Sequence, residues 1–168
     1  MTMKDVIERT SELGPLLVQL TVPDAEAAIA FYLEAFGGSE LYRNRETADG
    51  GRVAHCELLV AGARIMLHDE FPEYGLLAPA SLGGTSVSLN LYVADVDETY
   101  ARAIAAGGEI ITSPTDHFWG ARSGALHDPF GHRWVISTQI EDPSPDEIIR
   151  MSNAIPGMTR LSAAARRR

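Results

Sequence analysis

The chain has little cysteine and no long apolar run. Cys56 is the single cysteine among 168 residues, so an intrachain disulfide is excluded and a reducing cytoplasm is the expected location. The N-terminus lacks the apolar run of a signal peptide, and no stretch predicts a membrane span. The motifs of several enzyme classes are absent too: a phosphate-binding loop, a dinucleotide fingerprint, a CxxC pair and a serine–histidine–aspartate spacing.

Positive charge is also scarce. Lys and Arg number 14 against 23 Asp and Glu, which gives a net charge of −9. Because this excess repels phosphates, neither a nucleic acid nor an anionic membrane is expected as a partner. The terminal Arg166–Arg168 cluster is interpreted as a solvated end. Apolar residues make up 45% of the chain, enough for one domain with a substantial core.

The sequence contains an internal repeat. The stretch "LLVQLTVPDAEAAIAFYLEAFGGSEL" begins at Leu16, and "VSLNLYVADVDETYARAIAAGGEII" begins at Val87. Each runs from an alternating strand through an aspartate to an alanine-rich helix that stops at two glycines. Asp24 and Asp95 are predicted helix N-caps, and the glycines are predicted helix ends. Apolar residues recur at the same spacing in both helices, which predicts one face of each helix on a sheet.

Three strand-like stretches follow each helix, which predicts an α+β fold of duplicated βαβββ modules that form a curved mixed sheet. The expected strands are 40–47, 52–60 and 63–69, then 109–113, 121–127 and 133–139. The predicted organisation is an N-terminal extension (1–15), a single domain (16–141) and a C-terminal helix with a flexible tail (142–168). Within the domain we expect module one (16–70), a loop-like linker (71–86) and module two (87–141). The motif Ser144-Pro145-Asp146-Glu147 predicts the start of the C-terminal helix.

This pattern resembles the vicinal oxygen chelate superfamily, and within it the glyoxalase and bleomycin-resistance branch, close to its PhnB-like members. The matching stretches are "AIAFYLEAFGG", "HCELLVAGARIML", "DEFPE", "LGGT", "SLNLYVADVD", "FWGARSG" and "DPFGHRW". The resemblance implies a glyoxalase-like fold and a homodimer. It leaves the function open, because the superfamily includes metal-dependent isomerases, dioxygenases and fosfomycin-modifying enzymes as well as metal-free antibiotic-sequestering proteins.

The resemblance also implies where a metal would bind. The four ligand positions of the chelate enzymes correspond here to Leu17, Met66, Ser88 and Val135. Hard or borderline divalent ions prefer imidazole and carboxylate ligands, which these positions lack. We therefore expect no metal and no other cofactor.

A polar group is predicted on the hairpin "RVAHCELLVAGARIMLHDE". If the hairpin turns at Ala61-Gly62, Glu57 faces Met66 and His55 faces His68 on the cavity side. These four side chains are candidate ligand-binding residues. The two histidines and the glutamate are also compatible with a displaced metal site, and His55 and Glu57 with acid–base catalysis.

Five further residues are candidate ligand contacts. Gln19 and Asn90 are equivalent in the repeat and are expected to point two amides into one groove, and Tyr92 shares the face of Asn90. Trp119 and Arg122 lie in the loop "DHFWGARSG" and suit a planar or anionic molecule. Alternatively, Trp119 closes an apolar mouth and Arg122 pairs with an acid.

The stretch "ALHDPFGHRWVIST" is interpreted chiefly as architecture, since Asp128-Pro129-Phe130-Gly131 has the residues of a tight turn. The leading hypothesis is a cytoplasmic, metal-independent protein that binds a small, partly apolar molecule, with protection or resistance as a compatible role. The alternative is a lyase or isomerase that uses His55 and Glu57, with or without a displaced metal. A scaffold without a ligand is a third reading, and the sequence leaves open whether the protein is an enzyme.

Overall fold

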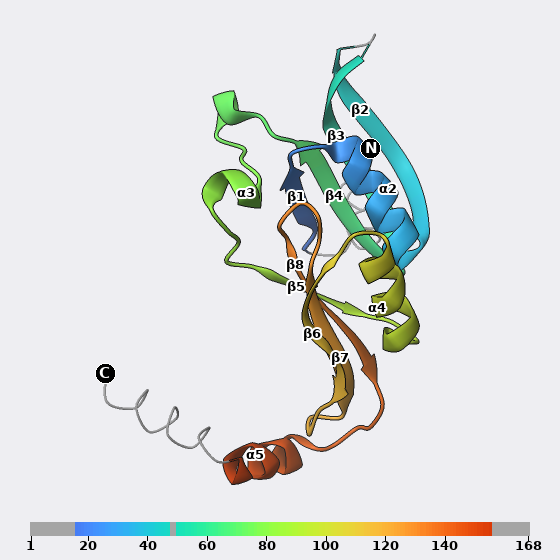
Figure 1. Ribbon diagram of the computed structural model, residues 1–168, viewed down its shortest axis with the longest axis vertical. Coiled ribbons are helices and arrows are strands. Elements are labelled where there is room, and N and C mark those ends of the chain that lie inside the picture. Colours follow the sequence, from blue (N-terminus) through green and yellow to red (C-terminus); the bar gives the residue numbers. More distant parts are fainter. Residues whose placement is uncertain (1–15, 48–49, 156–168) are drawn as a thin grey trace, which may run out of the picture.

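The structure is a computed structural model that describes residues 16–47 and 50–155. Two βαβββ modules follow one another along the long axis of the molecule, and their long helices lie together on one flank (Figure 1). The predicted N-terminal extension, the end of the C-terminal tail and the terminal arginine cluster lie outside the described residues.

Both modules have the same strand order. Module one consists of β1 (Val18–Val22), α2 (Ala25–Phe36), β2 (Gly38–Thr47), β3 (Gly50–Val60) and β4 (Ala63–Asp69), and its sheet has the order β1-β4-β3-β2. Module two consists of β5 (Ser88–Tyr92), α4 (Val96–Ala105), β6 (Glu109–Asp116), β7 (Ala121–His127) and β8 (Arg133–Gln139), in the order β5-β8-β7-β6. In each sheet the first strand pairs in parallel with the last, and the other pairs are antiparallel. The predicted duplication and fold class are confirmed.

The helices begin and end where the sequence predicts. The Asp24 side chain accepts a hydrogen bond from the Ala27 amide at 3.0 Å, and Asp95 accepts one from Glu98 at 2.9 Å. Gly37 ends α2 with a φ of 70°, a conformation that favours glycine. The inward faces are buried as the repeat predicts: Ala25, Ala28, Ile29, Tyr32 and Phe36 in α2, and Val96, Thr99, Tyr100 and Ala103 in α4.

A polar joint in the core connects the two modules. Asp128 is buried and accepts hydrogen bonds from the Tyr32 hydroxyl at 2.7 Å and the Trp134 indole at 2.9 Å. It also accepts from the backbone amides of Phe130 and His132. Since Tyr32 belongs to α2 of module one, the turn of module two is fastened to the other module. The "DPFG" stretch is therefore architectural, as predicted.

The linker between the modules contains helical turns, and a helix follows module two. Two short helices, η1 (Pro72–Tyr74) and α3 (Pro79–Leu82), interrupt the linker that the sequence predicts as a loop. Each begins with a proline, a residue suited to the first helical position but too weak a signal in so short a segment. Helix α5 (Pro145–Ala154) starts with the predicted capping box and lies beyond module two (Figure 1).

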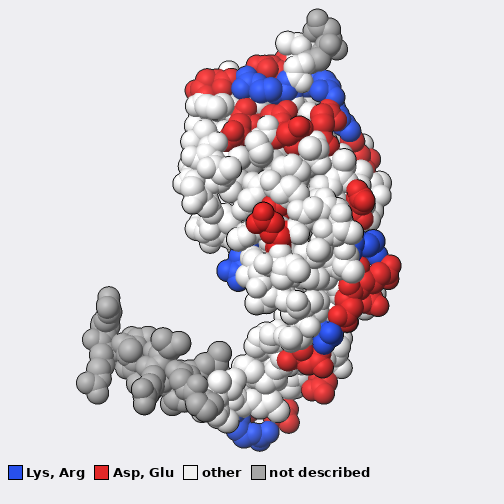
Figure 2. Space-filling view, viewed as in Figure 1, with Lys and Arg blue, Asp and Glu red and all other residues white. Residues whose placement is uncertain are grey.

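Charged side chains are unevenly spread over the face shown in Figure 2. They gather at one end of module one and along one edge of module two, with a mostly uncharged area between. In the described part of the chain, no helix is both long and apolar enough to cross a membrane.

Candidate functional site

The candidate site lies on the face of the first sheet that is turned away from α2. One row of paired residues crosses all four strands: Tyr42 pairs with Glu57, Glu57 with Met66, and Met66 with Gln19. The predicted hairpin register, with Glu57 opposite Met66, is confirmed. Cys56, Leu58, Ile65 and Leu67 point to the opposite side and are buried in the core.

Glu57 is at the centre of a polar cluster. The residue is only 6% exposed, and its Oε1 accepts a hydrogen bond of 2.6 Å from the Tyr42 hydroxyl. His55 Nε2 lies 3.3 Å from the same oxygen. Arg64 Nε lies 3.2 Å from Oε2 and forms an ion pair, yet Oε2 has no hydrogen-bond donor among the described residues. The cluster of Tyr42, His55, Glu57 and Arg64 is called the Glu57 cluster below.

The Glu57 carboxyl group is held in its charged form. The hydrogen bond from Tyr42 lowers the pKa of Glu57 below its ordinary value, and His55 and Arg64 act in the same direction. Burial alone raises this pKa, but the partners outweigh it. The same hydrogen bond raises the pKa of Tyr42. At neutral pH, Glu57 is therefore a strong acceptor and a weak base.

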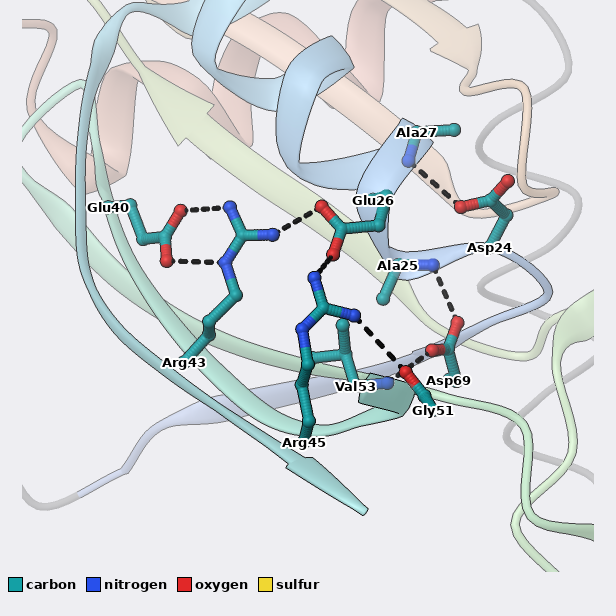
Figure 3. Close-up of polar contacts among 10 residues, drawn as sticks. All are labelled: Asp24, Ala25, Glu26, Ala27, Glu40, Arg43, Arg45, Gly51, Val53 and Asp69. Carbon is teal, nitrogen blue, oxygen red and sulfur yellow. Dashed lines mark hydrogen bonds and ion pairs between the residues drawn. The ribbon is translucent and has the colours of Figure 1, made fainter. Parts of the chain in front are cut away.

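Ion pairs fix the strand that contributes Tyr42. Arg43 bridges Glu40 and Glu26, and Arg45 reaches the same Glu26 at the start of α2 (Figure 3). Nearby, the Asp69 carboxylate accepts from the amide of Ala25 at 2.7 Å and from that of Val53 at 2.6 Å. These contacts hold β2 and β3 against the helix, and they give Tyr42 a fixed position over Glu57.

His68 does not join the cluster as predicted. Its Nδ1 lies 2.7 Å from the Asp69 carbonyl oxygen and its Nε2 lies 3.3 Å from Thr21 Oγ1. Of the predicted trio, only His55 and Glu57 are in polar contact. Accordingly, residues 16–47 and 50–155 contain no group of three His, Cys, Asp or Glu side chains that could hold a metal ion.

The metal positions implied by the resemblance do not fit a divalent ion either. Met66 is on the first sheet, whereas Ser88 and Val135 are on the second. Leu17 and Val135 have no side-chain atom that can ligate, and a thioether and a hydroxyl are poor ligands for hard or borderline ions.

The two predicted amides border different hollows. Gln19 borders a hollow of about 250 Å³ between β1 and the linker, while Asn90 borders another of about 240 Å³ between the edges of the two sheets. Tyr92 is 59% exposed and lines a third hollow beside α4. Each amide belongs to its own four-stranded sheet, and the single groove predicted for the two stays a prediction.

Trp119 and Arg122 have partners within the second module. The Trp119 ring stacks on His117, with the ring centroids 4.1 Å apart. Arg122 Nε donates to Asp97 and its Nη1 to Asp116, both at 2.8 Å. For Arg122, the structure therefore matches the alternative of pairing with an acid.

Sequence reasoning missed Tyr42 and Arg64 as members of the cluster. Arg64 lies two residues before Met66, so strand alternation could have placed it on the same face. Tyr42 follows an irregularity in β2 between Glu40 and Tyr42 that shifts the register, and the sequence gives no signal for this shift.

The duplicated βαβββ plan, with its two mixed sheets, defines the class of glyoxalase-like proteins. Residues 14–136 match the model of the Glyoxalase/Bleomycin resistance protein/Dioxygenase superfamily, and the chain belongs to this family.

Individual relatives agree with this assignment. Uncharacterized protein Rv0887c from Mycobacterium tuberculosis (strain H37Rv) is 39% identical over 132 residues, which cover 77% of this chain and 76% of that protein. TioX from Micromonospora sp. ML1 is 28% identical with a TM-score of 0.59, over 75% of this chain and 98% of TioX. The PhnB protein from Bacillus cereus is 20% identical with a TM-score of 0.57, over 74% of this chain and 99% of that one, and it supports the fold alone.

Proposed function

We propose that this protein binds a small organic molecule on the open face of its first sheet, without a metal or another cofactor. The observation that carries the proposal is the Glu57 cluster. Glu57 is a buried charged group on the open face of a sheet, and Arg64, which forms an ion pair with it, donates no hydrogen bond to any described residue. A buried ion pair contributes little to stability, so a ligand is the better explanation for its presence.

A role in protection against a toxic small molecule is compatible with the family description, which includes bleomycin resistance proteins. A cytoplasmic location is part of the proposal. It is supported by the buried, unpaired Cys56, because burial raises the pKa of its thiol to about 11 and keeps it unreactive.

We also propose that the protein forms a homodimer. The support is exposed apolar surface on module two, where Val87, Tyr92 and Ile110 are each about 60% exposed. Light scattering after size exclusion is the test, and a monomer at micromolar concentration would contradict it.

The contact between His55 and Glu57 favours a second function: proton transfer in a lyase or isomerase. Binding remains the better proposal, because a general base works best with a pKa near neutral and Glu57 has a lowered one. If a compound that binds at the Glu57 cluster is converted into a product, the lyase or isomerase function is favoured.

The experiment is a fragment screen on ¹⁵N-labelled full-length protein that has been treated with EDTA. We expect fragments that shift the amide signals of Tyr42, Glu57 and Met66. Thr112, Ala125 and Val135, which occupy the equivalent row of the second sheet away from the hollow beside Arg64, are the internal control. Fragments that shift only the control row would overturn the proposed site. Binding that requires added zinc or manganese would overturn the metal-free part.

A further inference from the structure

We infer that the ligand is a small monocarboxylate and that Arg64 binds its carboxylate group. This inference rests on the proposed function and names the chemistry of the molecule that the first sheet binds.

The hydrogen-bonding state of Arg64 is the first argument. Most other described arginines donate to acidic side chains: Arg43, Arg45, Arg52, Arg102 and Arg122. Arg64 donates no hydrogen bond to any described residue, although only 29% of its side chain is exposed. A half-buried guanidinium carries five donors, so a ligand that accepts from them gains charge-assisted hydrogen bonds without displacing a hydrogen bond from Arg64 to a described residue.

Glu57 holds this guanidinium in place. Its carboxylate is fixed from one side by Tyr42 and His55, and from the other it pairs with Arg64 Nε. Because Nε is the Arg64 nitrogen that lies near Glu57, the two terminal nitrogens are the atoms best placed to meet a ligand. Two parallel N–H groups match the two oxygens of a carboxylate, which makes Arg64 a bidentate receptor and Glu57 its positioning residue.

The surrounding charge limits the ligand to a single negative charge. Glu57 lies next to the position of the ligand head group and repels it, and the chain carries a net charge of −9. A phosphate dianion doubles this repulsion. A cationic ligand is disfavoured at the same position because it meets the positive charge of Arg64.

The neighbours of Arg64 indicate the size and polarity of the rest of the ligand. Leu59, the cross-strand partner of Arg64, is 38% exposed. Arg64 also borders the hollow of about 240 Å³ between the sheet edges, together with Val18, Leu89 and Asn90. Pockets for drug-sized ligands measure about 300–1,000 Å³, so this hollow suits a compact apolar group.

The test compares matched acids and amides: acetate with acetamide, hexanoate with hexanamide, and benzoate with benzamide. Each is titrated into ¹⁵N-labelled full-length protein while the Nε–Hε signal of Arg64 is followed, with benzylamine as the cationic comparison. We expect hexanoate or benzoate to move this signal and to bind at least about tenfold more tightly than its amide. Arg64→Gln is expected to remove this preference and Arg64→Lys to keep part of it, while Arg150→Gln, an exposed arginine on α5, is the matched control.

The outcomes separate this inference from the proposed function. If the amides or benzylamine shift Tyr42 and Met66 as strongly as the acids, or if Arg64→Gln binds benzoate normally, the carboxylate inference is overturned and binding at this face stands. If no compound of any charge shifts these signals, and the fragment screen finds none either, both proposals fail. The amide spectrum of Arg64→Gln shows whether the variant is folded.

Discussion

The equivalent row of residues contains a buried charged side chain in the first sheet and only uncharged side chains in the second. In module one it reads Tyr42, Glu57, Met66 and Gln19, and in module two the paired residues are Thr112, Ala125, Val135 and Asn90. Both sheets nevertheless have the same strand order. Module two reaches this architecture with a buried alanine where module one has a buried glutamate. The fold therefore does not require the Glu57 cluster, which is why we assign the cluster to ligand binding.

At the turns between the last two strands, it is module two that contains a buried carboxylate. In module one, the turn between β3 and β4 is Ala61-Gly62, which has no polar side chain. Ala61 adopts a φ of 46° there. In module two, the corresponding turn contains Asp128, which accepts four hydrogen bonds. The buried carboxylate of module one, Glu57, therefore lies on the open face of a sheet, whereas the buried carboxylate of module two, Asp128, lies in the core.

Removal of the Asp128 carboxylate is the change with the largest expected effect. Asp128→Ala leaves two side-chain donors and two backbone amides without an acceptor, each at about 1–3 kcal/mol and not fully additive. We expect the free energy of unfolding in urea to fall by about 4 kcal/mol. Asp128→Asn keeps one oxygen and is expected to lose less. A loss under about 1 kcal/mol for the alanine variant would show that the joint between the modules is unimportant.

The second change makes module one resemble module two. In Glu57→Leu/Arg64→Leu, an ion pair is replaced by apolar side chains, which is often neutral or stabilising. We expect the free energy of unfolding to stay within about 1 kcal/mol of the original protein, while benzoate binding falls at least about tenfold. A loss of several kcal/mol would mean that the cluster is structural.

These comparisons show which parts of the molecule could be predicted. Local periodicity determines the repeat, the helix caps at Asp24 and Asp95, and the pairing of Glu57 with Met66. These features could therefore be predicted from the sequence. The partners of Gln19, Asn90 and Arg122 depend on how separate elements assemble. Arg122, for example, meets Asp97 from a helix 25 positions earlier in the chain, which no strand pattern reveals.

The third change tests the charge of Glu57. Tyr42→Phe removes the hydrogen bond that lowers the pKa of Glu57 most, so the protein is expected to be less stable at pH 7. A lowered pKa in the folded state stabilises the protein above the unfolded carboxyl pKa of about 4.3, and this contribution is lost as the pH falls through the folded pKa. We therefore expect the difference in stability between the two proteins to shrink below about pH 4. Thermal unfolding from pH 3 to 7 measures it, and a difference independent of pH would rule out this linkage.

The smallest effect is expected at the turn of module one. Ala61→Gly relieves a positive φ that alanine tolerates poorly, partly offset by the greater entropy of glycine in the unfolded chain. We expect a gain of about 0.5 kcal/mol in unfolding free energy. Gly131→Ala at the turn of module two is the opposite control: its φ is 89°, and an added Cβ would lie 3.0 Å from Pro79, so stability is expected to fall. A loss in both variants would mean that the φ of Ala61 is not strained.

The joint between Tyr32 and Asp128 also has a consequence for protein synthesis. The two residues are 96 positions apart, and every strand of module one leaves the ribosome before Asp128 is made. During that interval, the Tyr32 hydroxyl and the aromatic face of α2 lack the acceptor and the rings that later cover them. Domains generally fold from the N-terminus as they are translated. Module one therefore exposes this face of α2 until module two covers it. The Tyr32 hydroxyl therefore gains its acceptor only after most of module two has been translated.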